Sequence, residues 1–233
     1  MARRFMPVLL AALMAACGPP AEDGRVTDAP PAVADASAVD QNLVCGSDDE
    51  EAQALLSAPK GAKRVSEHTL VVTHGSGVRE FVDEKTSGVD LDRHHWNYCG
   101  YLPTLKAHLV GLQDGELFSG KLLLEDNGAV LDAGQAVFPA PDGKRFLAAE
   151  QVNGSDLQQW TVADLAGGRF WVGDSGVIEN GYILIEYGNP HWISNSVLQA
   201  DATCTNSAGT KGQATFTIKA GSGSWQTDLK CKA

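Results

Sequence analysis

Two adjacent histidines with acidic neighbours form the first candidate site for chemistry in this sequence. His94 and His95 follow Asp90 and Asp92 closely, and imidazole and carboxylate groups can bind a metal ion or hydrogen-bond a sugar. Consecutive side chains on an extended strand point to opposite faces, so both imidazoles rarely reach one ion. We therefore expect a polar surface stretch beside a packed Trp96, with no metal site and no cofactor.

The five cysteines provide a second candidate metal site. None of them forms a Cys-x-x-Cys pair, which is the usual unit of a structural zinc site. Four of them are Cys45, Cys99, Cys204 and Cys231. An even number of cysteines in an exported protein favours two disulfides. Three pairings are possible. We favour Cys45 with Cys99, which would pin the start of the domain to its interior, and the remaining pair would then close a short C-terminal hairpin.

A third candidate is the tetrapeptide Gly173-Asp174-Ser175-Gly176, with His74 upstream. The tetrapeptide resembles the segment around the nucleophile of chymotrypsin-like proteases, and the resemblance implies a serine hydrolase. That family continues with a second Gly and a Pro, where this chain has Val177 and Ile178, and it has a Cys after the His, where this chain has Gly75. Triads are defined by geometry and roles. We expect a turn at this position and assign no catalytic residue.

The first residues have the composition of an export signal. Arg3 and Arg4 precede an apolar run from Phe5 to Ala16, as in a secretory signal peptide. The run is shorter than the ~20 residues that a membrane-spanning helix needs. Its end, Leu13-Met14-Ala15-Ala16-Cys17, resembles the lipobox of bacterial lipoproteins, with Met14 where Leu is commoner.

The lipobox resemblance implies an address. Residues 1–16 would be removed, and Cys17 would carry lipid and become the first residue of the mature protein. Gly18 in place of Asp after the cysteine is similar to outer-membrane sorting. We therefore expect a lipid-anchored protein of the cell envelope, at the outer membrane, and leave open which face it occupies.

Charge and composition divide the rest of the chain into two parts. Removal of residues 1–16 takes away Arg3 and Arg4 and moves the formal charge from −11 to −13, which excludes nucleic acid as a partner. Residues 17–41 are rich in Pro and Ala and contain no aromatic residue, as expected of a disordered tether. Residues 42–233 contain all five Trp and have the size of one domain.

Turn sequences typical of hairpins recur at short intervals along the domain. They are Gln113-Asp114-Gly115, Asp126-Asn127-Gly128, Pro141-Asp142-Gly143, Ala166-Gly167-Gly168 and Glu179-Asn180-Gly181. The segments expected as strands are 69–73, 79–82, 116–124, 145–151, 157–164, 170–172, 182–187, 214–219 and 225–230. This spacing predicts an all-β fold, an antiparallel meander of short hairpins.

Two further segments carry local expectations. One helix is expected at Asp48–Ser57, with acids near its N-terminal end and with Leu55 and Leu56 facing inward. His191 and Trp192 follow Asn189-Pro190, which indicates a structured loop. Most of the five Trp are expected to be buried.

Residues 137–171 carry a more specific pattern. The aromatic Phe138, the turn Pro141-Asp142-Gly143-Lys144 and the apolar strand after it resemble the WD40-like propeller repeat of Tol-system and related bacterial proteins. Ala140 stands where Ser is usual. A blade takes ~40–45 residues, so the domain has room for about four. The resemblance implies blade-like, propeller-like sheets or a small sandwich. The region from Tyr101 to Tyr187 is also similar to uncharacterised bacterial proteins with no known activity.

From these observations we expect a non-enzymatic β domain that is held at a membrane by the lipid on Cys17 and binds a protein or an envelope polymer. Three alternatives remain open. They are an immunity-like inhibitor that meets a basic partner through acidic surface, a carbohydrate-binding module with solvent-facing aromatic rings, and a hydrolase that uses Ser175 or the His94–His95 region.

Overall fold

The computed structural model describes residues 42–46, 48–58, 61–85, 93–115, 117–151, 158–174, 178–179, 182–222 and 224–232. All of them belong to the second of the two units into which the chain divides, Val39–Ala233. The predicted signal (1–16), the tether (17–41) with Cys17, and the residues Asp90, Asp92 and Ser175 lie outside the described part. No helix among the described residues has the length and apolar character needed to span a membrane.

The strands form four sheets, which we number by the chain order of their longer strands, and the first two occupy the N-terminal half of the domain. The first sheet contains β2 (Ala62–Ser66), β3 (Thr69–His74) and β4 (Gly77–Val82). The second contains β5 (Glu84–Lys85), β6 (Arg93–Leu102), β7 (Ala107–Asp114), β8 (Leu117–Leu124) and β9 (Val130–Ala133). The only described helix, α1 (Asp48–Ser57), has its most extensive contacts with β6.

The other two sheets follow in the C-terminal half. The third sheet has the order β1 (Leu43–Val44), β10 (Ala136–Pro139), β11 (Arg145–Gln151), β12 (Gln158–Asp164) and β13 (Arg169–Asp174). The fourth contains β14 (Ile178–Glu179), β15 (Tyr182–Ser194), β16 (Val197–Asn206), β17 (Lys211–Ala220) and β18 (Trp225–Lys232).

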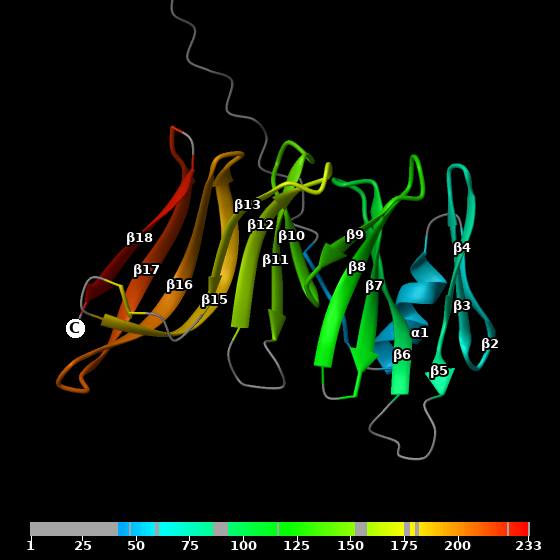
Figure 1. The fold of residues 1–233 in the computed structure, drawn as a ribbon, viewed down its shortest axis with the longest axis horizontal. Helices are drawn as coiled ribbons and strands as arrows, with labels where there is room; N and C mark the ends of the chain where they lie inside the picture. The colour runs from blue at the N-terminus through cyan, green and yellow to red at the C-terminus, as the bar shows by residue number, and fades with distance from the viewer. Residues whose placement is uncertain are drawn as a thin grey trace, which may run out of the picture. The chain divides into compact units, whose positions relative to one another are not determined.

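Every described strand pairing is antiparallel, and nearly all join strands that are consecutive in the chain. Figure 1 shows these consecutive strands side by side within each sheet. The exception is β1, which joins the third sheet through the pairing of Leu43 with Val137 and Val44 with Ala136. The predicted all-β fold of antiparallel, blade-like hairpin meanders is confirmed.

Three apolar cores bind the sheets to one another in chain order. The first and second sheets meet through residues such as Leu70 and Val110, and the second and third through residues such as Leu109 and Phe146. The third and fourth meet through Leu147 and the residues packed with it. Burying each of these side chains contributes roughly 1.5–3 kcal/mol.

Strand β11 shows why its sequence is almost continuously apolar. Phe146 and Ala148 are buried against the second sheet, whereas Leu147 is buried against the fourth. Successive side chains of a strand point to opposite faces, and both faces of the third sheet are covered. Three consecutive apolar positions, 146 to 148, therefore all lie in the protein interior.

The turn between β10 and β11 has the geometry that its sequence predicts. Gly143 has a φ of 64°, a left-handed conformation that glycine adopts at little cost. The Lys144 N–H donates to Oδ1 of Asp142 at 3.0 Å, and the N–H of Ala140 donates to the carbonyl of Arg145 at 2.9 Å. A Cβ at position 143 would lie 2.3 Å from the carbonyl oxygen of Thr104 in the second sheet's β6–β7 turn. The glycine is needed both for the turn and for this close approach.

Both expected disulfides are present. Cys45 is joined to Cys99, with 4.7 Å between their Cα atoms, and this bond links the segment after β1 to β6. Cys204 is joined to Cys231 with a Cα separation of 6.3 Å. The second bond does not close a hairpin as expected, because β17 lies between β16 and β18. The small residues Gly212 and Ala214 of β17 pair with the two cysteines and leave room for the crossing.

Several local expectations need correction. The helix has the predicted bounds, but Leu56 is 84% exposed and only Leu55 packs on the core. Leu55 and Leu56 are consecutive, about 100° apart around the helix axis, so one narrow face cannot bury both. Trp192 lies in strand β15 and not in a loop. Of the five Trp, only Trp160 is fully buried, and the other four are partly exposed.

Candidate functional site

A buried carboxylate connects the helix to the first two sheets. Glu51 of α1 is 8% exposed. Its Oε1 accepts a hydrogen bond from the backbone N–H of Tyr98 at 2.8 Å, and its Oε2 accepts one from Nε of Arg64 at 3.0 Å. Charge-assisted hydrogen bonds of this kind compensate the cost of burying a carboxylate. Glu51 therefore positions α1 against β6 and β2.

A second carboxylate, Asp83, extends this network to the histidine pair. Its Oδ2 lies 2.9 Å from Nδ1 of His95, and its Oδ1 accepts from the N–H of Trp96 at 2.9 Å. The other ring nitrogen of His95 lies 3.5 Å from Nη2 of Arg64. A guanidinium can only donate, so Nε2 of His95 accepts and Nδ1 donates to Asp83. Both ring nitrogens thus serve to hold β6 in place.

His94 faces different partners from His95. Its Nε2 lies 2.8 Å from Oδ1 of Asp114, and its Nδ1 lies 3.5 Å from Oε2 of Glu84. The two imidazoles therefore do not converge on one point. Among the described residues, no group of three or more His, Cys, Asp or Glu side chains is arranged to hold a metal ion.

The protease-like residues are not brought together. His74 ends β3 of the first sheet, where its Nδ1 lies 3.1 Å from the hydroxyl of Ser76. Asp174 ends β13 of the third sheet and accepts a hydrogen bond from Nε2 of Gln159 at 2.8 Å. The first sheet, which carries His74, and the third sheet, which carries Asp174, each pack against the second sheet. Ser175 itself lies outside the described residues.

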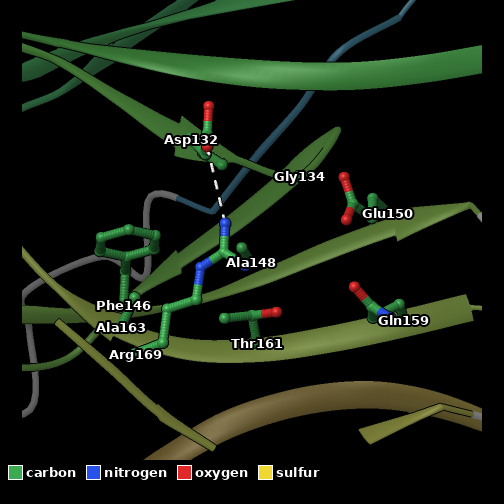
Figure 2. A pocket seen from close by; sticks show the side chains of 10 residues that line it. Asp132, Gly134, Phe146, Ala148, Glu150, Gln159, Thr161, Ala163 and Arg169 are labelled. Carbon is green, nitrogen blue, oxygen red and sulfur yellow. Dashed lines mark ion pairs between the residues drawn. The ribbon is translucent and has the colours of Figure 1, made fainter. Parts of the chain in front are cut away.

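A small charged pocket lies where β9 of the second sheet meets the third sheet. Figure 2 shows Arg169 reaching across the pocket toward Asp132, with Glu150 and Gln159 on its other side. A guanidinium nitrogen of Arg169 lies 3.6 Å from Oδ2 of Asp132. Lys121 donates to Oδ1 of Asp132 at 2.6 Å and thereby lowers the pKa of that carboxyl, whereas partial burial raises the pKa of Glu150.

The size of this pocket limits what it can bind. Its volume of about 50 Å³ holds a few water molecules, since one water needs at least ~10–15 Å³ measured in this way. The pocket is therefore too small for a substrate, and the Arg169–Asp132 ion pair beside it joins the third sheet to the second.

Two larger cavities lie on either side of the open end of the β10–β11 hairpin. The first, which we call the Asn97 cleft, has a volume of about 390 Å³. It is lined by Cys45, Gly46, Asn97, Gly111, Leu112, Gln113, Phe118, Ser119, Gln135 and Gln151. The second, the Trp160 cleft, has a volume of about 450 Å³. It is lined by Val44, Gln135, Ala136, Phe138, Ala149, Glu150, Gln151, Gln158, Trp160, Tyr187, Gly188, Asn189 and Pro190.

Both cavities have the size of ligand sites, which commonly measure ~300–1,000 Å³. They share Gln135 and Gln151, so each of these amides lines two neighbouring cavities. Glu150 is the one charged side chain among the described residues that line them. The other polar side chains of the two linings are amides, the hydroxyls of Ser119 and Tyr187, and the indole of Trp160.

Each cleft is lined by a residue with a buried polar atom that lacks a partner. Trp160 is 2% exposed, and its indole Nε1–H finds no acceptor among the described residues. Oδ1 of Asn97 likewise finds no donor there. Leaving such a group unpaired costs about 1–3 kcal/mol.

Sequence reasoning did not identify either cleft. Gln135 and Gln151 flank the hairpin that the propeller-like pattern predicts, yet isolated glutamines form no motif. Trp160 belongs to the second strand of that pattern and was expected only as a core residue. Its burial without a hydrogen-bond partner is a property of the packed sheets that could not be seen in the sequence.

No model of a known protein family matches this chain, and no curated protein matches it.

Proposed function

We propose that this chain is a lipid-anchored envelope protein whose β domain, residues 42–233, binds a macromolecular partner without catalysing a reaction. The address rests on the lipobox-like segment that ends at Cys17 and on Gly18 after it. The two disulfides suit this address, because disulfides persist in oxidising compartments outside the cytoplasm.

The observation that carries the binding role is the pair of adjoining clefts that share Gln135 and Gln151. Their linings offer many neutral hydrogen-bonding groups beside apolar and aromatic surface, which is typical of sites that hold a ligand. Two neighbouring cavities also suit an extended ligand better than a single small molecule. A protein segment or an envelope polymer has this form.

The polar networks outside the clefts support a role without catalysis. A catalytic base needs a free position at hydrogen-bonding distance from the group it activates. Both ring nitrogens of His95 contact Asp83 and Arg64, and both ring nitrogens of His94 lie close to carboxylates. These side chains hold strands together, and we assign them no part in a reaction.

The test is crosslinking in intact cells, followed by recovery of the lipidated chain from membranes. A Cys17→Ser chain, which should lose its lipid and leave the membrane fraction, serves as the control for anchoring. We expect one dominant partner that is crosslinked to the wild-type chain and is lost with the Cys17→Ser chain. A Cys17→Ser chain that stayed in the membrane would contradict the anchor. Recovery of no specific partner would contradict the binding role.

A further inference from the structure

We infer that the outer face of the first sheet is a surface through which two copies of this chain associate. The inner face of this sheet packs toward the second sheet through Leu70, Val72 and Phe81. In Figure 1, α1 and the second sheet lie on one side of the first sheet. Side chains alternate between the two faces of a strand, so the residues between these three point outward. Neither the lipid anchor nor the two clefts takes part in this association.

The outward side chains form a surface that we call the valine face. It consists of Lys63 and Val65 of β2, Thr69, Val71 and Thr73 of β3, and Val78, Glu80 and Val82 of β4. Val65, Val78 and Val82 are 54%, 59% and 52% exposed, whereas the central Val71 is surrounded by its neighbours and is 8% exposed. Half of the positions on this face are therefore valine, and three of these valines lie open to solvent.

The fourth sheet provides a comparison within the same molecule. Its inner face packs toward the third sheet through residues such as Phe216, Ile218 and Leu229. The exposed positions that alternate with these buried residues on β16, β17 and β18 include Asp201, Thr215, Lys219, Gln226 and Lys230. An antiparallel sheet with one solvated face normally shows such polar residues there. Clustered exposed apolar side chains, as on the valine face, indicate a contact surface instead.

Two charged residues on the valine face identify a second copy as its occupant. Val71 lies in the middle strand, with Lys63 opposite it on β2 and Glu80 opposite it on β4. Lys63 and Glu80 are thus separated by two strand spacings, about 10 Å. A two-fold rotation about an axis parallel to β3 places β2 of a second copy over β4 of the first. Each Lys63 then lies over the partner's Glu80, and two ion pairs form across the interface.

The same rotation brings the apolar side chains together. Thr69 pairs with Val82 on one side and with Ser66, the neighbour of Val65, on the other. Val82 of each copy therefore lies over the partner's Val65, and the two Val71 side chains face each other across the axis. A two-fold dimer requires a surface that is complementary to itself. The valine face meets this requirement with both its charged and its apolar groups.

The size of the face sets the strength of the association. Three strands about 4.8 Å apart, each five or six residues long, give a footprint of ~15 Å by ~20 Å on each copy. Interfaces that bury less than ~1,200 Å² in total are typically weak and transient. We therefore expect a reversible dimer that forms at high local concentration, with the monomer predominating at low micromolar concentration.

The test is sedimentation velocity of the full chain over a range of protein concentrations, in detergent whose micelles greatly outnumber the chains. Lys63→Glu leaves two carboxylates on the valine face, and Glu80→Lys leaves two ammonium groups. Each variant alone should lower the association constant by roughly tenfold, because two ion pairs become two like-charge contacts. Lys219→Glu, the same charge change at an exposed position of the fourth sheet, is the matched control and should associate as the wild type does.

The decisive sample is an equimolar mixture of the Lys63→Glu and Glu80→Lys chains. One valine face is then acidic and the other is basic, so the mixture should associate at least as strongly as the wild type, although neither chain associates well alone. Recovery in the mixture also shows that both variants fold, because an unfolded chain has no face to offer.

The inference is overturned if the wild-type chain stays monomeric up to millimolar concentration, if Lys63→Glu associates as the wild type does, or if the mixture fails to recover. It is also overturned if Lys63→Glu removes a different protein from the crosslinked complexes of intact cells while the wild-type chain is monomeric, since the face would then belong to that protein.

Discussion

Glu51 accepts a hydrogen bond at 2.8 Å from the backbone N–H of Tyr98, 47 residues further along the chain. The same carboxylate also accepts from Arg64. One side chain of a ten-residue helix thus joins elements of two sheets. An isolated helix of this length is marginal in water, so its place in the fold depends on contacts of this kind.

We predict that Glu51→Ala lowers the free energy of unfolding by about 3 kcal/mol, because it leaves the Tyr98 N–H and the Arg64 guanidinium without their buried acceptor. Denaturant unfolding followed by tryptophan fluorescence measures this change. Glu80→Ala, at an exposed position of β4, is the control and should change stability by less than about 0.5 kcal/mol. Equal effects of the two substitutions would show that Glu51 is not a structural anchor.

A pair of glycine substitutions separates backbone strain from crowding. Gly143→Ala combines a φ of 64° with a Cβ 2.3 Å from the carbonyl oxygen of Thr104. Gly167→Ala has a φ of 86° and no atom within 4 Å of the added Cβ. We expect Gly167→Ala to cost about 1 kcal/mol and Gly143→Ala about 3 kcal/mol or more. Thermal unfolding of both variants tests this order, and similar losses would mean that the turn and Thr104 move apart freely.

The pH dependence of stability should change in Glu150→Gln. Burial raises the pKa of Glu150 above its usual value of 4.5 in the folded protein. Folding therefore favours the neutral carboxyl. The stability that this carboxyl contributes to the folded protein is complete below pH 4.5 and is lost as the pH rises through the folded pKa.

Melting temperatures between about pH 4 and pH 7 measure this effect. The melting temperature of the Glu150→Gln chain should rise steadily relative to that of the wild type as the pH increases over this range, because the variant has no carboxyl to ionise at this position. Glu186→Gln, at an exposed position of β15, provides the comparison and should follow the wild type. A constant difference between Glu150→Gln and the wild type at all pH values would refute the raised pKa.

Removal of either disulfide should destabilise the domain by a similar amount. The bonded residues are 54 and 27 positions apart, and the chain-entropy treatment gives about 4 kcal/mol for loops of both lengths. Denaturant unfolding of the Cys45→Ala/Cys99→Ala and Cys204→Ala/Cys231→Ala chains tests the size of the loss. Peptide mapping of the unreduced wild-type protein tests the pairing, and any Cys45–Cys204 or Cys45–Cys231 peptide would contradict it.

Features with a strong local cause could be predicted from the sequence. The helix bounds, strand β11 and the turn at Gly143 all follow from residues that are neighbours in the chain. Strand β16 was missed because the Ser194-Asn195-Ser196 connection before it contains no Gly or Pro signal. The ten-residue strand β6 was not predicted, because its two histidines suggested a polar surface stretch.

The candidate site was harder to predict because it is made by packing between sheets. Gln135, Gln151 and Asn189 lie far apart in the sequence and acquire a common environment only where the third and fourth sheets meet. The burial of Glu51 has a similar origin. Its neighbours Asp48, Asp49 and Glu50 are also acidic, and no local pattern distinguishes the one acid that turns toward β6.

The placement of β1 has a mechanical consequence. The described chain enters the domain at this two-residue strand, which is paired to β10 and followed at once by Cys45. A pulling force applied through the preceding segment would first load the few hydrogen bonds between β1 and β10. It would then pass through the covalent bond to Cys99 into the middle of β6, whose pairing with β7 extends over most of the strand. The domain is therefore reinforced at the point where a tether would pull on it, and reducing this one bond should lower the force at which the third sheet begins to unravel.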